Sequence, residues 1–115
     1  MVTIDPAVVA RSVESVRGRI DRAGGRDRVR LIAVTKGFGP EAVRAAVAAG
    51  VDDIGESYLQ EMREKIDAIS ADASSGAKSP RWHVIGRVQR NKVRLVAPDV
   101  HLWHSVDRPE LGAEI

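Results

Sequence analysis

The sequence has no cysteine and few aromatic residues. Among its 115 residues there are one Phe, one Tyr and two Trp. Without cysteine the chain has neither a disulfide framework nor thiol chemistry. The few aromatic side chains leave little surface for stacking on nucleic-acid bases, and a formal net charge of +2 is too small to indicate a nucleic-acid partner by itself. We therefore expect no nucleic-acid partner.

Long hydrophobic runs are also absent. No apolar run approaches the length of a membrane span, and the first six residues, MVTIDP, lack the basic start and apolar stretch of a signal peptide. We expect no membrane partner, and together with the lack of cysteine these absences favour a cytoplasmic protein. A chain of this length makes one domain with a single core.

The most informative stretch spans residues 31–37, LIAVTKG, a short apolar run that ends in Lys36 and a glycine. Such a run is typical of a strand buried on both faces of a parallel sheet. Because side chains alternate along a strand, Ile32, Val34 and Lys36 share one face. Lys36 then lies at the carboxyl end of the strand, where α/β proteins place their chemistry, either as a solvated strand-end lysine or as a desolvated nucleophile.

The other segments alternate between helix and strand patterns. Asp5 and Pro6 predict the start of a first helix, which Gly24 and Gly25 end. We expect strands over residues 29–35, 51–55, 82–86 and 100–106, helices over 41–49, 59–69, 88–96 and from 107, and a loop over 71–80. One helix followed by four strand–helix units predicts an α/β fold with a parallel sheet, either doubly wound or about half of a TIM-type barrel. Because the chain ends about two turns into its last helix, we expect residues 1–115 to be part of a truncated single domain.

Two further segments carry groups suited to ligand binding. After the second strand, Glu56 is a candidate to orient a ligand or to pair with Lys36, and Ser57 offers a hydroxyl, although helix capping alone explains Ser57. After the third strand, Gly86 and the arginines of residues 87–94 either bind an anion or form a solvated basic helix face. Each segment is open to a binding role and to a structural one.

The three histidines, His83, His101 and His104, lack a metal-ligand spacing with acidic partners. His101 and His104 differ by three positions in one expected strand, so their side chains are expected on opposite faces of the sheet. We therefore expect no metal site shared by these two residues.

Four segments together resemble the pyridoxal phosphate homeostasis protein family, which is similar in fold to the barrel domain of alanine racemase. They are LIAVTK at 31–36, GESY with QE at 55–61, WHVIG with Gln89 and NK at 82–92, and HSVD at 104–107. The segments follow the family's order at compatible spacings, and the resemblance extends over nearly the whole chain. Each motif alone is weak, but four in register make the resemblance specific.

The resemblance implies a single-domain barrel that holds pyridoxal 5′-phosphate (PLP) as an internal Schiff base, with Lys36 as the matching lysine. It implies a role in intracellular PLP homeostasis without established turnover, so we do not expect an enzyme. The cofactor-binding residues that it implies are Lys36, Glu56, Ser57, Tyr58 and His83. Ser57 stands where the family usually has asparagine, and its hydroxyl has a shorter reach.

In the family, the phosphate cup and the arginine that faces the pyridine nitrogen come from strands beyond the position of Ile115. We therefore expect the chain alone to bind PLP weakly or not at all. Half a barrel also leaves two unpaired sheet edges and an uncovered apolar face, which predicts a homodimer, a swapped assembly or a complementing carboxyl-terminal half.

Two alternative functions remain open at this point. The first is a racemase-like amino-acid enzyme that uses Lys36 as base and imine former, although such racemases need a second base from an added domain. The second is a nucleic-acid-binding module built on the basic residues Arg87, Arg90, Lys92 and Arg94.

Overall fold

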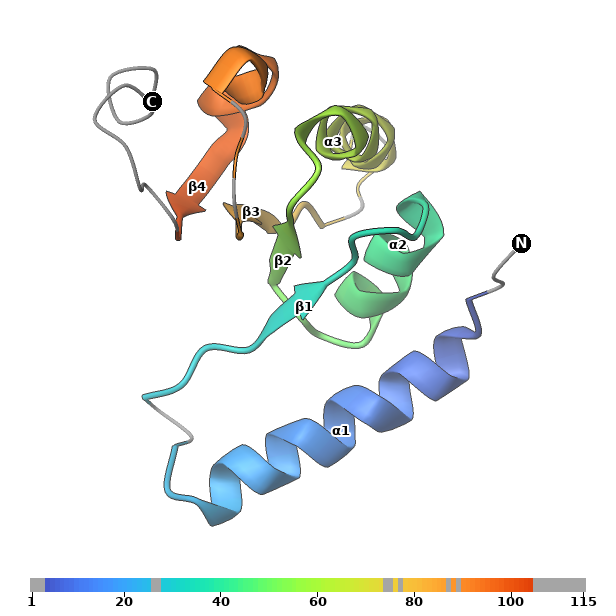
Figure 1. Ribbon diagram of the computed structural model, residues 1–115. Coiled ribbons are helices and arrows are strands. Elements are labelled where there is room, and N and C mark those ends of the chain that lie inside the picture. Colours follow the sequence, from blue (N-terminus) through green and yellow to red (C-terminus); the bar gives the residue numbers. More distant parts are fainter. Residues whose placement is uncertain are drawn as a thin grey trace.

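Four parallel strands form the centre of the computed structural model, which describes residues 4–25, 28–73, 76, 78–86, 88 and 90–104 (Figure 1). The strands are β1 (Ile32–Val34), β2 (Asp53–Glu56), β3 (Arg81–Val84) and β4 (Val100–Trp103). Between and before them lie the helices α1 (Pro6–Arg22), α2 (Pro40–Ala48) and α3 (Leu59–Ala73), and the 3-10 helices η1 (Arg90–Leu95) and η2 (Ala97–Asp99).

The order of the strands in the sheet is the order in the chain, β1-β2-β3-β4. Each connection therefore joins neighbouring strands, as in a β/α barrel, whereas a doubly wound sheet reverses direction at a switch point. The predicted α/β class with parallel strands is confirmed, and so is its resemblance to about half of a TIM-type barrel.

The two faces of the sheet have different surroundings. On one face, Ile54, Trp82 and Val84 are buried in the core with Val43 of α2 and Met62 of α3, and Figure 1 shows both helices on that side. The register places Val34, Gly55, His83 and Leu102 in one row on the opposite face, with Ile32 beside them. We call this the open face, because Val34 is 49% exposed and Leu102 48% exposed.

Helix α1 begins as predicted. The Asp5 carboxylate accepts a hydrogen bond from the backbone N–H of Ala7 at 3.0 Å, and Pro6 occupies the first helical position. The helix packs against α2, and Arg17 donates to the carbonyl of Gly50 at 2.8 Å. Gly24 follows the helix with a φ of +79°, a left-handed conformation that glycine adopts without strain. No helix in the described part of the chain is long and apolar enough to span a bilayer.

Some predicted boundaries and one predicted helix type are wrong. The helix expected over residues 88–96 is the shorter 3-10 helix η1 at Arg90–Leu95, and η2 follows it; the buried residues Val93 and Val96 are spaced by three. A spacing of three fits the tighter 3-10 turn. Helix α3 continues to Ala73, three residues into the expected loop, because Ala71 and Ala73 favour helix. The helix expected from residue 107 lies outside the described residues.

Candidate functional site

Lys36 lies just beyond the carboxyl end of β1 on the open face. The backbone N–H of Thr35 donates to the carbonyl of Gly55 at 3.1 Å, so the ladder continues one residue past the strand. Thr35 is buried on the helix side, and alternation therefore directs Lys36 to the open side, where its side chain is exposed. Gly37, with a φ of +83°, and a hydrogen bond from Phe38 N–H to the Thr35 carbonyl turn the chain toward α2.

Glu56 does not pair with Lys36. It is fully buried on the helix side of β2, where Oε1 accepts a hydrogen bond from Thr35 Oγ1 at 2.6 Å and forms an ion pair with Lys65 Nζ of α3. Lys65 Nζ also donates to the backbone carbonyl of Thr35 at 2.8 Å. We call these three residues, Thr35, Glu56 and Lys65, the buried charge cluster.

Ser57 and Tyr58 follow β2 at the same end of the sheet as Lys36. Ser57 is half-buried, and its Oγ would lie 3.3 Å from a Cβ built on Gly86. Gly86 has a φ of +77°, so this turn after β3 both requires glycine and leaves room beside the Ser57 hydroxyl. Tyr58 is 58% exposed, and its carbonyl accepts a hydrogen bond from Met62 N–H at 2.9 Å in the first turn of α3.

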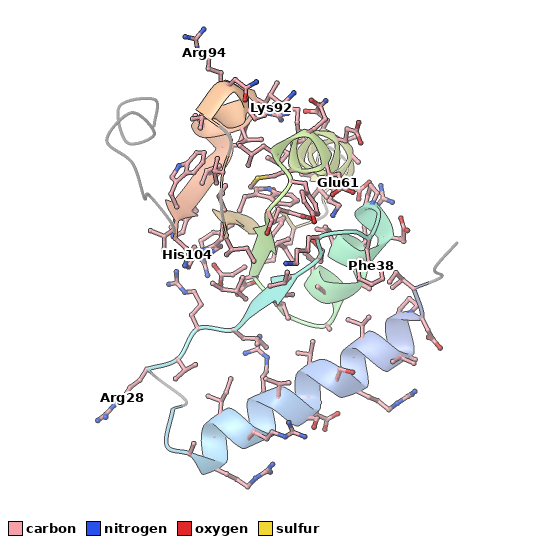
Figure 2. All side chains as sticks on the ribbon, in the orientation of Figure 1. Arg28, Phe38, Glu61, Lys92, Arg94 and His104 are labelled. Atoms are coloured by element: carbon pink, nitrogen blue, oxygen red, sulfur yellow. The ribbon has the colours of Figure 1, made fainter. Side chains whose placement is uncertain are left out.

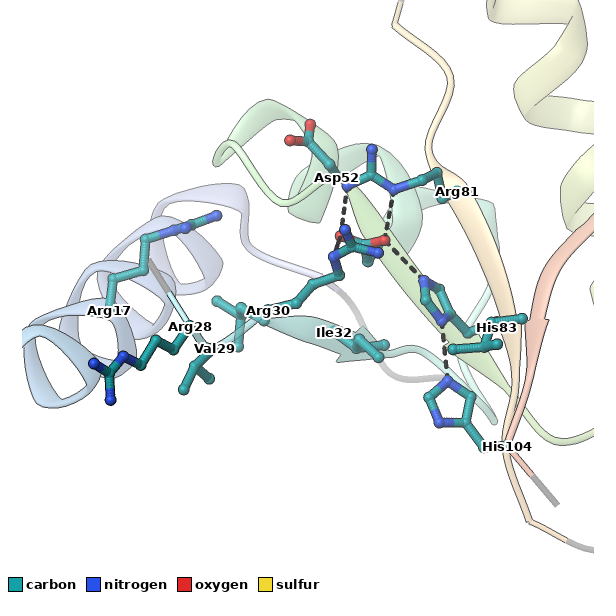
Figure 3. Close-up of a pocket in the computed structure, with 12 residues that line it drawn as sticks. Arg17, Arg28, Val29, Arg30, Ile32, Asp52, Arg81, His83 and His104 are labelled. Carbon is teal, nitrogen blue, oxygen red and sulfur yellow. Dashed lines mark hydrogen bonds and ion pairs between the residues drawn. The ribbon is translucent and has the colours of Figure 1, made fainter. Parts of the chain in front are cut away.

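His83 lies on the open face in register with Gly55 and Val34, and its ring contacts Asp53, the first residue of β2. Its Nε2 is 2.8 Å from Asp53 Oδ1, its Nδ1 is 3.0 Å from His104 Nε2, and Arg81 donates to both oxygens of Asp53 at 2.9 and 3.0 Å (Figure 3). We call these four residues the open-face network. Because a carboxylate only accepts hydrogen bonds, His83 Nε2 carries the proton that it shares with Asp53.

Asp53 is the anion of this network. Two hydrogen bonds from Arg81 lower the pKa of its carboxyl to about 2, burial opposes that shift, and His83 and Arg30 add to it. An aspartate with these partners is ionised at neutral pH. This explains why β2 contains a residue that normally disfavours strands.

The expectation that His101 and His104 lie on opposite faces is wrong. Their rings have centroids 5.4 and 5.2 Å from that of His83, so both contact the same residue. The pairing of β3 with β4 shifts between Trp82 and His83, and this irregularity inserts an extra residue that breaks the simple alternation. In the described part of the chain, no three His, Asp or Glu side chains are arranged to hold a metal.

A cavity of about 620 Å³ opens beside the open-face network. Four arginines contribute to its lining together with Asp52, Asp53, His83 and His104; the arginines are Arg17, Arg28, Arg30 and Arg81. In Figure 3, Arg17 and Arg28 lie on the side away from His104, so the two histidines form the opposite wall. The Lys36 side chain does not line this cavity, which therefore lies apart from the strand end that carries Lys36.

The basic segment after β3 lies elsewhere. Figure 2 shows Lys92 and Arg94 together on η1, away from His104 on the open face. Arg87 and the side chain of Arg90 lie outside the described residues. Of the predicted cofactor-binding residues, Lys36, Ser57 and Tyr58 lie at the carboxyl end of the sheet and Glu56 faces the helices. His83 lies on the open face, one residue before the carboxyl end of β3.

Sequence reasoning missed Lys65 and Asp53 as members of these two clusters. A signal for Lys65 is its spacing, since it stands three residues after Met62 and four before Ile69 on the apolar stripe of α3. A lysine at that position is buried and needs a partner. For Asp53 the signal is an acidic residue inside an expected strand.

The carboxyl end of the sheet has features that suit PLP. It combines an exposed lysine amine on the open face with a half-buried hydroxyl and a glycine turn that a Cβ would partly fill. When bound, PLP supplies an aldehyde that condenses with a lysine amine. In this chain, Lys36 and Ser57 are the residues whose groups would suit such a ligand. The class defined by fold and site is thus a half-barrel of β/α units with a lysine at the end of its first strand.

Known proteins match the chain in sequence and in structure. The pyridoxal phosphate homeostasis protein of Pseudomonas aeruginosa is 38% identical over 114 residues, which cover 95% of this chain and 47% of that protein. PipY of Synechococcus elongatus, solved with PLP bound, superposes with a TM-score of 0.72 at 31% identity, over 92% of this chain and 45% of PipY. An unknown protein from Bifidobacterium adolescentis gives a TM-score of 0.82 at 31% identity, over 98% of this chain and 51% of that one.

No protein-family model matches the chain. The chain spans about half the length of the curated relatives that it matches. It is a homologue of the pyridoxal phosphate homeostasis proteins over that half, and the resemblance inferred from its sequence motifs is confirmed.

Proposed function

We propose that this chain is the lysine-bearing half of a PLP-binding protein of intracellular PLP homeostasis, and that it holds PLP as a Schiff base on Lys36. The observation that carries the proposal is the position of Lys36, exposed on the open face at the carboxyl end of β1 and at the same end of the sheet as Ser57. The homology to pyridoxal phosphate homeostasis proteins and the PLP-bound PipY structure support it.

The roles proposed for the other predicted residues follow from where they lie. Ser57, whose hydroxyl lies beside Gly86, and the exposed Tyr58 are the other residues that would contact PLP. Glu56 acts from the helix side of the sheet, through its hydrogen bond to Thr35, because its carboxylate faces the helices. His83 is assigned to the open face, where its ring is held by Asp53.

An absorbance titration with PLP tests this function. The wild-type chain is expected to develop an imine band that Lys36→Ala abolishes and that Lys78→Ala retains. Lys78 is the matched control because it is an exposed lysine that pairs with Asp52 near the opposite ends of the strands. Binding by the chain alone is expected to be weak, since phosphate contacts supply much of the affinity for such a cofactor. A band that survives Lys36→Ala would contradict the proposal.

The open face is the surface for the partner in this proposal. Val34 and Leu102 leave apolar area exposed there, and β1 and β4 are the two edges of the sheet. Light scattering is expected to detect a homodimer of half-barrels, or a tight complex when residues matching the remainder of a relative are co-expressed. A compact monomer at all concentrations that gains nothing from the co-expressed half would contradict this part.

The last part of the proposal is that the protein acts in PLP homeostasis by binding PLP in the cytoplasm, without catalysing a reaction. The relatives are named for pyridoxal phosphate homeostasis rather than for a reaction. A chain that racemises an amino acid after loading with PLP, with turnover lost in Lys36→Ala, would favour the racemase-like alternative instead.

A further inference from the structure

The buried charge cluster lies directly beneath the residue that precedes Lys36. Lys65 is 2% exposed and Glu56 is fully buried, although lysine and glutamate are rarely buried at all. The residues come from three parts of the fold, since Thr35 directly follows β1, Glu56 ends β2 and Lys65 lies on α3. The function proposed above gives Lys65 no task and leaves open what Glu56 does through Thr35.

All the hydrogen-bonding groups of Thr35 are engaged. Its N–H donates to Gly55, its hydroxyl donates to Glu56 Oε1, and its carbonyl accepts from Lys65 Nζ at 2.8 Å and from Phe38 N–H at 3.1 Å. With these bonds made, the carbonyl of the peptide that links Thr35 to Lys36 is held by two donors, Lys65 Nζ and Phe38 N–H. Two of the four bonds come from the charged side chains of the cluster.

If its role were purely structural, the cluster would also carry a high desolvation cost. Glu56 Oε2 is buried without a hydrogen-bond partner among the residues that the structure describes. Burying two charges costs desolvation free energy that an apolar pair of the same size would avoid, so an apolar pair is often as stable or more stable. A charged pair that is retained beside a candidate lysine therefore calls for an explanation other than stability.

We propose that Glu56 and Lys65 are positioning residues, which fix Thr35 so that the side chain of Lys36 leaves the strand end toward the open face in a single direction. The inference rests on the proposed role of Lys36. It assigns a task to Lys65, which lies on the opposite face of the sheet from the Lys36 amine and pairs with Glu56.

The test uses the double variant Glu56→Met/Lys65→Met in the full chain. It removes both charges together at similar volume, so the core keeps its packing and neither charge is left unpaired. Thr35 then loses the acceptor of its hydroxyl and one donor to its carbonyl. Where this variant fails to fold, Thr35→Val and Thr35→Ser replace it, because valine removes only the hydroxyl and serine keeps it.

Two readouts are compared with those of the wild type. The first is the affinity for PLP, which is expected to fall at least about tenfold in the double variant, or in Thr35→Val, and to stay near the wild-type value in Thr35→Ser. The second is the rate at which an acylating reagent labels Lys36 relative to Lys92, measured by mass spectrometry. This ratio needs no PLP and is expected to change at least about threefold, because the reach and direction of the amine decide its access to the reagent.

A folded double variant with wild-type affinity and a wild-type labelling ratio would overturn the inference. If the wild type itself shows no Lys36-dependent PLP band, the proposed function fails, and the labelling ratio alone decides the positioning role. An altered ratio then supports it and an unaltered ratio rejects it. Lys78→Met, at an exposed lysine, is the control and is expected to leave both readouts unchanged.

Discussion

The sheet carries a charged network on each of its faces, and the two differ in how far they are closed from water. The buried charge cluster of Thr35, Glu56 and Lys65 lies between the sheet and α3, with both charged side chains almost fully buried. The open-face network buries Asp53 and His83, but the Arg81 side chain is 44% exposed and His104 lies at the surface.

This difference in exposure to water indicates on which charges the stability of the fold depends. In the buried cluster each ion is the main partner of the other, so loss of either leaves a charge in the core. In the open-face network, Asp53 has Arg81, His83 and Arg30 around it, and water reaches the arginines. When one partner of Asp53 is removed, the remaining partners still stabilise its charge, so the cost in stability is smaller. The comparison predicts a graded series of stability effects.

The largest effect is expected for Lys65→Met. This change leaves the Glu56 carboxylate in the core without its ion-pair partner. Breaking a buried pair by removing one partner costs about 3–5 kcal/mol. Urea-induced unfolding measures this loss. Lys78→Met is the control, since that exposed pair with Asp52 contributes at most about 1 kcal/mol. Equal losses in the two variants would show that the buried cluster is no more important than a surface pair.

The next effect is expected for Asp53→Asn, which keeps the shape of the side chain and removes its charge. Arg81 and His83 lose their ionic acceptor, and since Arg81 can return to water the cost is on the order of 2 kcal/mol. Asp52→Asn makes the same change of charge one residue earlier, at a half-exposed site, and is expected to cost about 0.5 kcal/mol or less. A loss in Asp52→Asn as large as that in Asp53→Asn would contradict the assignment.

The pKa of Asp53 also predicts how the wild type responds to acid. Its folded-state value is lowered to about 2, so the carboxylate contributes stability that is fully present above the unfolded-state pKa near 4. That contribution is lost as the pH falls from about 4 toward 2, because the folded carboxylate then becomes protonated. In this window the free energy of unfolding should fall more steeply for the wild type than for Asp53→Asn. Parallel curves would contradict the prediction.

Much of the fold was predictable from sequence because its signals are local. Asp5 with Pro6, the apolar run ending at Lys36 and Gly24 after the first helix each report a backbone preference that the structure keeps. The partners of the charged residues were not predictable. Glu56 was assigned to Lys36 or a ligand, but its partner Lys65 lies on the next helix, and only the pairing of β1 with β2 brings Thr35 to both.

The histidines illustrate the same limit. Strict alternation predicted His101 and His104 on opposite faces, but an irregularity in the pairing of β4 brings both rings to His83. Such an irregularity depends on how the two strands meet in three dimensions, and the sequence of β4 alone carries no clear signal for it.

The smallest effect is expected for His104→Ala. It removes the partner of His83 Nδ1, a ring nitrogen of a residue that is 1% exposed, and a lost hydrogen bond of this kind costs about 1 kcal/mol. His101→Ala removes only a ring contact to the same His83 and is expected to cost less. Urea unfolding of both variants ranks them, and NMR of the His83 ring nitrogens should respond to His104→Ala more than to His101→Ala. If the order were reversed, His83 would depend on ring packing rather than on the hydrogen bond, and the open-face network would end at His83.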